Sequence, residues 1–372
     1  MLKFLERSLK HLLSTLLRFF LPRDSGSIPD PKDVRRILVI RQHNQLGDML
    51  CAVPLLRALR LAYKSARIAL MASPVNADVM RNNRYIDSLI VYDKKNFTGN
   101  GGIHPGRLFT FIAQLRKERY DIVVVPMTVS VSFTSCLLAF LSGAKIRIGA
   151  ERIDGKENGS APFFTRPVEL DWRSEPHRHQ TLRNLDTARE LPLPEVPLSS
   201  EITLSGEELL AGNTIVVREV AGRKHAVAFH PGAGKVPNRW PAERFADVAN
   251  LLADRVQARV FVTRGPMDEE PVAGMLNQLQ ELPVVVQNKP IRVIAAILAH
   301  MDLVVSNDTG IMHVAAAVGV PVISLFGPTD PHQWAPIGSS HRYLFAGPDI
   351  MAISTEEVVK HAVELLDQKS LV

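Results

Sequence analysis

Short apolar runs alternate with helical patterns along most of the chain, and the runs form two series. Each run is continuous in Val, Ile and Leu, as in strands that are buried on both faces of a parallel sheet. The first series occupies residues 37–40, 68–71, 89–91, 122–125 and 146–148, and the second occupies 226–229, 260–262, 284–286, 303–305 and 322–325. The pattern predicts an α/β protein with two Rossmann-like domains that face each other across a cleft at the carboxyl ends of their strands.

The domain boundary is expected between the two series. Residues 150–210 are rich in Pro, Glu and Arg and contain no clear series of strands. We therefore expect one domain over residues 33–205, a second over 206–345 and a C-terminal helix over 350–372.

The N-terminal segment has a different pattern. Leucines recur at helical spacing through residues 1–22, with Lys and Arg mostly between them, and a Pro-rich stretch follows. This pattern predicts an amphipathic helix that lies in a membrane interface with its basic face toward anionic lipid. The alternative is a helix packed on the protein's own surface or on a partner.

Composition narrows the possible classes of protein. Of the 372 residues, 46% are hydrophobic and 22% are charged, which is typical of an ordered globular chain with two to three domains. We expect no transmembrane helix, because no apolar run reaches the roughly 18 residues required. Two cysteines are too few for a disulfide framework. The net charge of +6 suits phosphate-bearing molecules, but dispersed basic residues and 6% aromatic residues argue against a nucleic-acid partner.

The first strand is followed by a polar junction that ends in a helix predicted over residues 48–63. Gly47 allows a tight turn, and Asp48 stands at the expected helix start. Asp is a favoured N-cap, so capping explains Asp48 without any chemistry. The alternative is that its carboxylate faces the cleft and acts on a substrate.

The second junction, between His230 and Pro241, combines a Gly-rich turn with two cations. Backbone N–H groups around Gly232, together with Lys235 and Arg239, are suited to a diphosphate group. The segment matches neither a Walker A loop nor the dinucleotide fingerprint. A solvated turn is the alternative.

The third junction follows the strand at 303–305 and opens a helix of small residues. Asp308 or Thr309 can cap this helix, and Gly310 allows a ligand to approach the backbone. His313 lies one turn inside the helix, where it is either a ligand contact or a core residue. The chain has no Asp-x-Asp metal pair, so we expect no bound metal.

Together the three junctions resemble glycosyltransferase family 9, the heptosyltransferases of lipopolysaccharide core assembly. The resemblance rests on three blocks: Gln45-Leu-Gly-Asp48 with Pro54 and Leu59; Pro231-Gly-Ala233 with Arg239-Trp-Pro241; and Asp308-Thr-Gly310 with His313 and Phe326-Gly-Pro-Thr329. It implies a GT-B fold with an acceptor domain before a donor domain. It also implies inverting transfer without metal or cofactor, the nucleotide sugar being a substrate.

The resemblance also implies roles for individual residues. Asp48 falls on the proposed base, Glu269 on the residue that binds the nucleoside end, and a third group on positions that hold the ribose and phosphates of the donor: Asp308, Thr309, Gly310 and His313. Where the family often has Lys, this chain has Asn238, and phosphate contact then passes to Lys235 or Arg239. No residue is assigned to the acceptor.

The expected function is transfer of a sugar, heptose by resemblance, from ADP-heptose to a lipopolysaccharide core or related glycan. The enzyme would lie on the cytoplasmic face of the bacterial inner membrane. The alternatives are a transferase of the same fold with another nucleotide sugar, and a non-catalytic relative that binds nucleotide or glycolipid. A nicotinamide-dependent dehydrogenase is disfavoured, because neither first strand is followed by Gly-x-Gly-x-x-Gly.

Overall fold

The computed structural model describes residues 27–370, except for 44, 100–101 and 221. The helix predicted over residues 1–22 lies outside the described residues. The chain divides into two compact units, Met1–Leu198 and Ser199–Val372, called unit 1 and unit 2 below. Among the described residues, no helix has the length and apolar character needed to cross a membrane.

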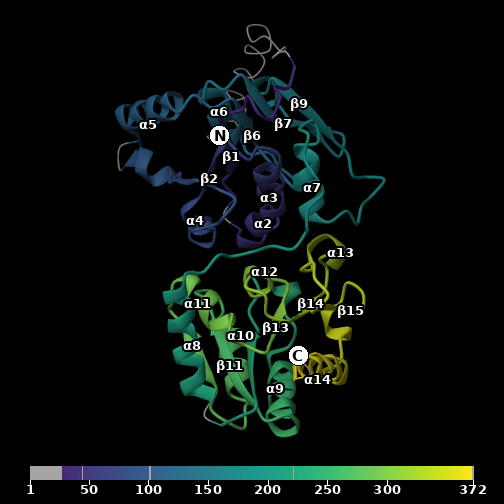
Figure 1. Cartoon of the computed structure of the whole chain (residues 1–372). Helices are drawn as coiled ribbons and strands as arrows, with labels where there is room; N and C mark the ends of the chain where they lie inside the picture. The colour runs from purple at the N-terminus through teal and green to yellow at the C-terminus, as the bar shows by residue number, and fades with distance from the viewer. Residues whose placement is uncertain (1–26, 44, 100–101, 221, 371–372) are drawn as a thin grey trace. The chain divides into compact units, whose positions relative to one another are not determined.

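The sheet of unit 1 is almost wholly parallel (Figure 1). Its central strand β1 (Arg36–Arg41) pairs in parallel with β2 (Arg67–Ala72) on one side and with β6 (Ile122–Val124) on the other. The order continues through β3 (Ser88–Val91) beyond β2, and through β7 (Ile146–Ile153) and β9 (Arg166–Leu170) beyond β6. The short strand β8 (Lys156–Glu157) pairs antiparallel with β7, and a separate hairpin joins β4 (Thr98–Gly99) to β5 (Gly102–Ile103).

The helices of unit 1 are α2 (Leu46–Leu50), α3 (Val53–Ala62), α4 (Pro74–Met80), α5 (Pro105–Lys117), α6 (Phe133–Leu141) and α7 (Gln180–Thr187). The single helix predicted over residues 48–63 is wrong, because the chain forms α2 and α3 instead. Pro54 is the second residue of α3. Proline has no N–H to donate, and its ring clashes with the carbonyl four residues earlier, so the helix cannot continue from Leu50.

The sheet of unit 2 is wholly parallel. Its strands are β10 (His225–His230), β11 (Ala258–Arg264), β12 (Val284–Gln287), β13 (Leu303–Asn307), β14 (Val322–Phe326) and β15 (His341–Phe345). They are arranged in the order β12-β11-β10-β13-β14-β15. Ten of the twelve main strands of the two sheets lie where the apolar runs predicted them, and the two that were not predicted are β9 and β15.

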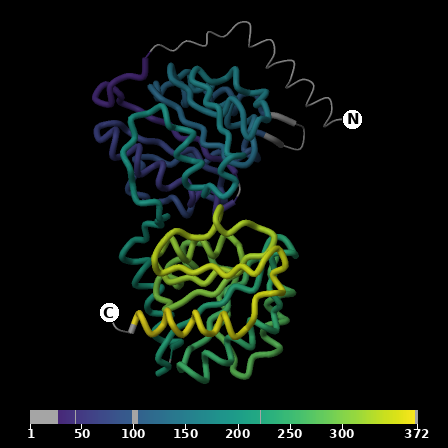
Figure 2. Tube along the Cα trace, turned by 90° about the vertical axis from the view of Figure 1, so that its right-hand side faces the viewer, coloured from purple at the N-terminus to yellow at the C-terminus, as the bar shows by residue number. Residues whose placement is uncertain are grey.

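Helices cover both faces of this second sheet (Figure 1). Helices α8 (Gly206–Val220) and α11 (Ile291–Leu298) pack together on one face. On the other face α9 (Ala242–Arg255), α10 (Glu269–Leu276) and α14 (Thr355–Ser370) enclose a core that includes Phe229, Trp240 and Phe245. Figure 2 shows α14, in yellow, crossing this face, where it packs on α9 and contacts β13 and β14.

The two main sheets share one strand order. Numbered within each unit, the order is 3-2-1-4-5-6, and it reverses direction between β1 and β6 in unit 1 and between β10 and β13 in unit 2. In open parallel sheets, ligands bind outside the carboxyl ends of the strands at this reversal, the topological switch point. The two switch points are therefore the places to look for a site.

Candidate functional site

The switch point of unit 1 holds a buried ion pair. Arg41 is the last residue of β1, and its Nη2 lies 2.9 Å from Oδ1 of Asp48 in α2. Its Nη1 donates a hydrogen bond of 2.8 Å to the carbonyl of Pro126, which follows β6. The two side chains are only 2% and 8% exposed. The guanidinium thus bridges both strands of the switch point and holds the carboxylate at their carboxyl ends.

The structure excludes the capping explanation for Asp48. Helix α2 begins at Leu46 with Gln45 as its N-cap, so Asp48 is the third residue of the helix. The side-chain hydrogen bond of Asp48 comes from Arg41. Capping was wrong because the helix begins two residues earlier than its predicted start.

His43 lies beside this pair and was missed by the sequence analysis. Burial lowers the pKa of His43, and the charges of Arg41 and Lys94 lower it further, whereas Asp48 raises it. Its Nε2 lies 3.4 Å from Oγ of Ser130, in the loop after β6. The switch point of unit 1 therefore places a neutral imidazole near the carboxylate at neutral pH.

The switch point of unit 2 is organised by Asn307, the last residue of β13. Its Nδ2 donates to the carbonyl of Pro231 at 2.9 Å, and its Oδ1 accepts from the N–H of Trp240 at 3.1 Å. Trp240 is itself buried and donates through Nε1 to the carbonyl of Ile353. Asn307 thus holds both ends of the Gly-rich loop after β10.

Asn238 connects three loops at the same edge of the sheet. Its Nδ2 donates to Oδ2 of Asp308 at 3.1 Å and to Oγ1 of Thr329 at 2.9 Å. Burial raises the pKa of Asp308, although hydrogen bonds from Thr329 and Asn238 and the charge of Lys235 oppose this rise. The residue that departs from the family pattern therefore has a structural role next to a predicted donor-binding residue.

Gly232 lies against a carboxylate that the sequence analysis did not identify. A Cβ on Gly232 would lie 2.0 Å from Oδ1 of Asp268, so only glycine fits there. Asp268 also accepts a hydrogen bond of 2.8 Å from the N–H of Gly265. Burial lowers the pKa of His230, which lies 3.7 Å from the same carboxylate. These contacts pack the loops after β10 and β11 together.

The cations predicted to contact the donor differ in their surroundings. Lys235 is exposed. Arg239 is half-buried, donates to the carbonyl of Ala233 at 3.0 Å and lies 3.4 Å from the exposed carboxylate of Glu270. Glu269 is also exposed and pairs with Arg264 at 3.1 Å. Lys235 and Arg239 lie on the loop after β10, and Glu269 is the first residue of α10, directly after the loop that follows β11.

The remaining predicted residues belong to the start of α12 (Gly310–Ala317). Thr309 is its N-cap, and its hydroxyl lies 3.4 Å from that of Ser306. Gly310 begins the helix. His313 is buried one turn later, with its ring edge-on to that of Trp334 at 6.4 Å. The predicted residues of unit 2 thus lie on or next to the loops at one edge of the sheet, whereas Asn307 and Asp268, which hold these loops in place, were not predicted.

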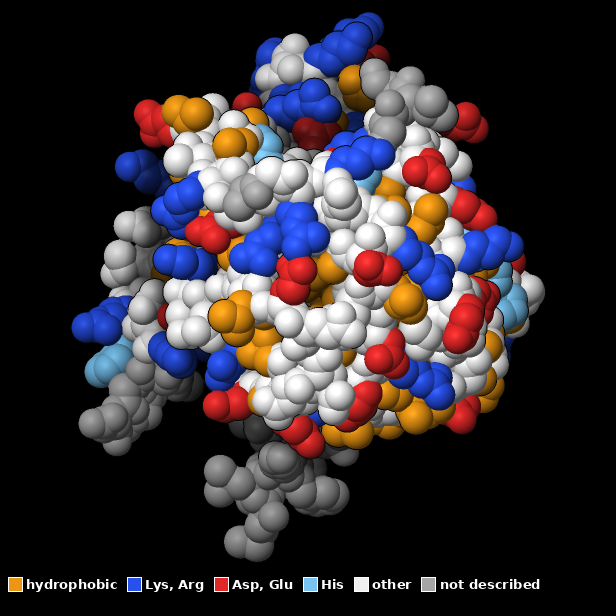
Figure 3. All heavy atoms as spheres, turned by 90° about the horizontal axis from the view of Figure 1, so that it is seen from below, with side chains coloured by type: hydrophobic (Ala, Val, Ile, Leu, Met, Phe, Trp, Pro, Cys, Tyr) orange, Lys and Arg blue, Asp and Glu red, His pale blue; other side chains and the backbone are white. Residues whose placement is uncertain are grey.

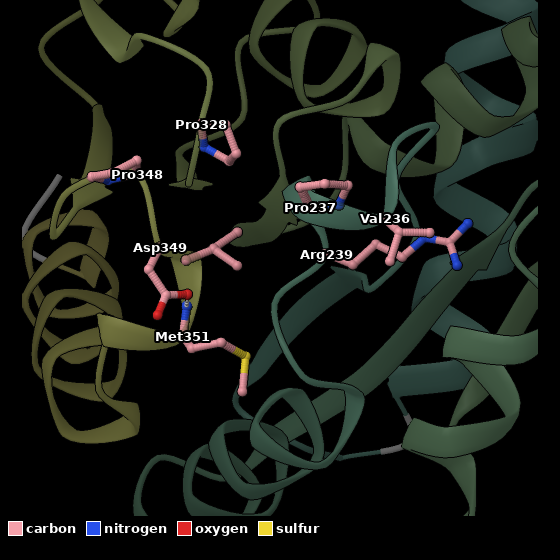
Figure 4. Close-up of a pocket in the computed structure, with 8 residues that line it drawn as sticks. Val236, Pro237, Arg239, Pro328, Pro348, Asp349 and Met351 are labelled. Atoms are coloured by element: carbon pink, nitrogen blue, oxygen red, sulfur yellow. Dashed lines mark hydrogen bonds between the residues drawn. The ribbon is translucent and has the colours of Figure 1, made fainter.

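A hollow of about 520 Å³ adjoins the Gly-rich loop of unit 2 (Figure 4). It is lined by Val236, Pro237, Arg239, Pro328, Pro348, Asp349, Ile350 and Met351. In Figure 4 the guanidinium of Arg239 points away from Asp349 and Met351. The lining is mostly apolar, so the hollow differs in character from the polar network around Asn238.

Neither a metal-binding cluster nor a basic field stands out in the described part of the chain (Figure 3). In it, no group of three or more His, Cys, Asp or Glu residues is placed to hold a metal ion. Figure 3 shows acidic and basic side chains interspersed over the face that it draws. This face lacks the single-sign basic field that a nucleic-acid-binding surface carries.

Comparisons with known proteins identify the family. The model of glycosyltransferase family 9 (heptosyltransferase) matches residues 108–356. Lipopolysaccharide heptosyltransferase 2 of Escherichia coli K12 is 26% identical over 320 residues, which cover 83% of this chain and 87% of the relative.

Solved structures agree with this assignment. A family 9 glycosyltransferase from Veillonella parvula is 26% identical with a TM-score of 0.78, over 92% of this chain and all of that one. The ADP-heptose lipopolysaccharide heptosyltransferase II of Escherichia coli, at 23% identity, has a TM-score of 0.73 over 90% of this chain and 99% of that one. The predicted GT-B type of fold, with two Rossmann-like units, is confirmed. The chain belongs to glycosyltransferase family 9 (heptosyltransferase), and it is a glycosyltransferase.

Proposed function

We propose that this glycosyltransferase moves heptose from ADP-heptose to a lipopolysaccharide core acceptor, with inversion at the anomeric carbon and without a metal ion. The observation that carries the proposal is the position of Asp48, a buried carboxylate held by Arg41 at the switch point of unit 1. The acceptor is supported by the name of a relative, a lipopolysaccharide heptosyltransferase, and the donor by the name of a solved structure, an ADP-heptose lipopolysaccharide heptosyltransferase.

In the proposed reaction Asp48 is the general base. Its carboxylate takes the proton from an acceptor hydroxyl while that oxygen attacks the anomeric carbon of the donor. The new carbon–oxygen bond forms as the bond to the diphosphate breaks, and ADP leaves with its electrons. Fixed orientation of the two sugars lowers the entropic part of the barrier.

Unit 2 binds the donor in this proposal. Backbone N–H groups at Gly232 and at the start of α12, behind Thr309 and Gly310, bind the diphosphate together with Lys235 and Arg239. Asp308 and His313 contact the ribose and phosphates, and Glu269 contacts the nucleoside end. The chemistry of this set supports metal-independent binding, because amides and cations supply the positive charge that a divalent ion would otherwise supply.

Residues 1–22 complete the proposal by binding the anionic surface of the membrane in which the acceptor is assembled. Their basic amphipathic pattern supports this role. The enzyme would then act at the cytoplasmic face of the inner membrane.

A panel of donors and acceptors tests the proposed activity. The full chain is incubated in EDTA with ADP-heptose, or with UDP- and GDP-hexoses, and with core acceptors that lack heptose, with or without lipid. We expect ADP release and a product heavier by one heptose only with ADP-heptose. Transfer from a hexose donor would favour the same-fold alternative, and nucleotide binding without transfer to any acceptor would contradict the proposed reaction. Turnover that requires added magnesium would contradict its metal independence.

A further inference from the structure

The ion pair at the switch point of unit 1 is unusual in its burial. Arg41 is 2% exposed and Asp48 is 8% exposed on their side chains. In unit 2 the comparable pair of Arg292 and Glu208 leaves the carboxylate 28% exposed. Removing two charges from water costs several kcal/mol per ion, so a buried pair of this kind is a weak source of stability. Stability of the fold therefore does not by itself explain why this ion pair is buried here.

Arg41 is fixed from two sides. One nitrogen donates to the carbonyl of Pro126, while the other donates to Oδ1 of Asp48 and approaches its backbone carbonyl at 3.5 Å. Burial lowers the pKa of Arg41, and the charge of Asp48 opposes this shift. The rigid fork of a guanidinium can hold both partners at set angles, which a lysine ammonium cannot do.

The two oxygens of the Asp48 carboxylate are not equivalent. Oδ1 accepts the hydrogen bond from Arg41. Oδ2 accepts none from any residue that the structure describes. A carboxylate has room for about four hydrogen bonds, and Oδ2 is not one of the fully buried side-chain atoms that lack a partner, so it is open to solvent or to a substrate hydroxyl. The contacts therefore leave one oxygen able to receive a proton.

We propose that Arg41 is a positioning residue for the transfer reaction: it holds the carboxylate of Asp48 so that Oδ2 faces the acceptor hydroxyl. This inference rests on the proposed function, in which Asp48 is the base. Arg41 itself touches no substrate and takes no proton.

A merely structural ion pair and a positioning ion pair give different forecasts. If Arg41 only stabilises the fold, its loss lowers the melting temperature, and turnover per folded molecule stays the same. If Arg41 positions Asp48, its loss lowers kcat and leaves KM for the donor unchanged, because the proposed donor site belongs to unit 2.

Two substitutions separate the charge of Arg41 from its geometry. Arg41→Lys keeps the charge, and we expect kcat to fall about tenfold because an ammonium lacks the rigid fork that holds both partners at set angles. Arg41→Gln removes the charge as well, and we expect kcat to fall about 10- to 100-fold. In both variants KM for the donor should stay near its wild-type value, because the proposed donor site belongs to unit 2.

Arg292→Gln is the matched control, since it breaks an arginine–carboxylate pair outside the proposed site. It should lower the melting temperature and leave kcat per folded molecule unchanged. Wild-type kcat in Arg41→Lys would overturn the inference, and this variant decides the matter if Arg41→Gln does not fold. Asp48→Asn, assayed in parallel, separates a failure of the proposed base Asp48 from a failure of the positioning role of Arg41. Wild-type turnover in Asp48→Asn contradicts the proposed base itself, whereas loss in Asp48→Asn with wild-type kcat in both Arg41 variants contradicts only the positioning role.

Discussion

The two switch points lie at equivalent places in two sheets of the same strand order, yet their chemistry differs. In unit 1 a guanidinium and a carboxylate meet in a buried site, and the pair bridges β1 and β6. In unit 2 the corresponding contacts come from two asparagine amides, Asn307 and Asn238, while Lys235 is exposed. One switch point therefore holds a single buried ion pair, whereas the other is held by amide hydrogen bonds that include the carboxylate of Asp308, with Lys235 exposed beside it.

This difference suits two halves of one reaction. A buried carboxylate with one oxygen unpartnered among the described residues is suited to accept a proton, which needs one atom at a defined place. A diphosphate spreads its charge over many oxygens and is bound by several N–H groups and mobile cations around a fixed loop. The same topology can thus serve proton transfer in one unit and anion binding in the other, depending on the residues at the strand ends.

The largest expected effect comes from Asp48→Asn. An amide cannot accept the proton of the acceptor hydroxyl, so turnover should fall on the order of 10² to 10⁴. Affinity for ADP, measured by calorimetry, should stay within about twofold, because the proposed donor site lies in unit 2. The variant should also melt at a lower temperature, since the substitution leaves a buried guanidinium without a counter-ion.

Glu118→Gln is a suitable control for Asp48→Asn. Its carboxylate pairs with Arg36 at 2.9 Å, but both side chains are more than a third exposed. The control should melt and turn over like the wild type. Wild-type turnover in Asp48→Asn would show that Asp48 is not the general base. The two switch points would then not differ in proton transfer, and another residue would have to act as the base.

A second, smaller effect is expected at the framework of unit 2. Asn307→Ala leaves the N–H of Trp240 and the carbonyl of Pro231 without their buried partner, which should cost about 2 to 4 kcal/mol of unfolding free energy. ADP should bind more weakly, because the Gly-rich loop is no longer held at both ends. Urea denaturation and calorimetry measure the two effects.

Asn250→Ala is the matched control for Asn307→Ala. Asn250 also donates to a carbonyl and accepts from an N–H, through Gln278 and Gln280, but these contacts lie at the surface. Water can replace them, so this control should lose less than about 1 kcal/mol. Equal losses of unfolding free energy in both variants, or wild-type ADP binding in Asn307→Ala, would contradict this prediction. The hydrogen bonds of Asn307 would then not determine the geometry of the donor site.

The central strands of both sheets were predicted from the sequence, whereas two edge strands were not. Continuous Val, Ile and Leu runs identify strands that are buried on both faces, and these runs lie in the centres of both sheets. Strands β9 and β15 were missed because they lie at sheet edges and mix polar with apolar residues, and β9 also contains Pro167. Residues 150–210, expected to lack strands, contain the end of β7, the short strand β8 and β9.

The candidate site was predictable to the level of its loops. Acidic residues and glycines directly after apolar strands drew attention to Asp48, Asp308 and Gly232. The partners of Asp308 and Gly232 were not predictable, because these pairings join segments far apart in the sequence: Asn238 lies 70 residues from Asp308. Arg41 carried a weak signal as a charged residue at the end of a buried strand, but its contact with Pro126 depends on the order of the strands.

The smallest predicted effect concerns the response of unit 2 to acid. Burial lowers the pKa of His341, in the edge strand β15, from 6.5 to about 4. Its Nδ1 is buried without a hydrogen-bond partner among the described residues. The unfolded chain therefore binds a proton on this imidazole more readily than the folded unit does. The contribution of His341 to stability is present above pH 6.5 and is lost as the pH falls toward about 4.

His341→Gln removes this titration, and we expect it to reduce the acid-induced loss of stability by an amount on the order of 1 to 2 kcal/mol. Hydrogen–deuterium exchange between pH 7 and 4, corrected for the intrinsic rate, follows β14 and β15 of unit 2 separately from β1 and β2 of unit 1. The substitution should reduce the acid-induced opening in unit 2 and leave unit 1 unchanged. His104→Gln, at an exposed position of unit 1, controls for the loss of an imidazole. Because His341 lies at the edge of the sheet and not at its switch point, turnover at neutral pH should be the same in all three proteins. An acid response that persists in His341→Gln would mean that other groups, such as the buried His230 beside Asp268, govern it, and would tie the acid stability of unit 2 to its donor loops.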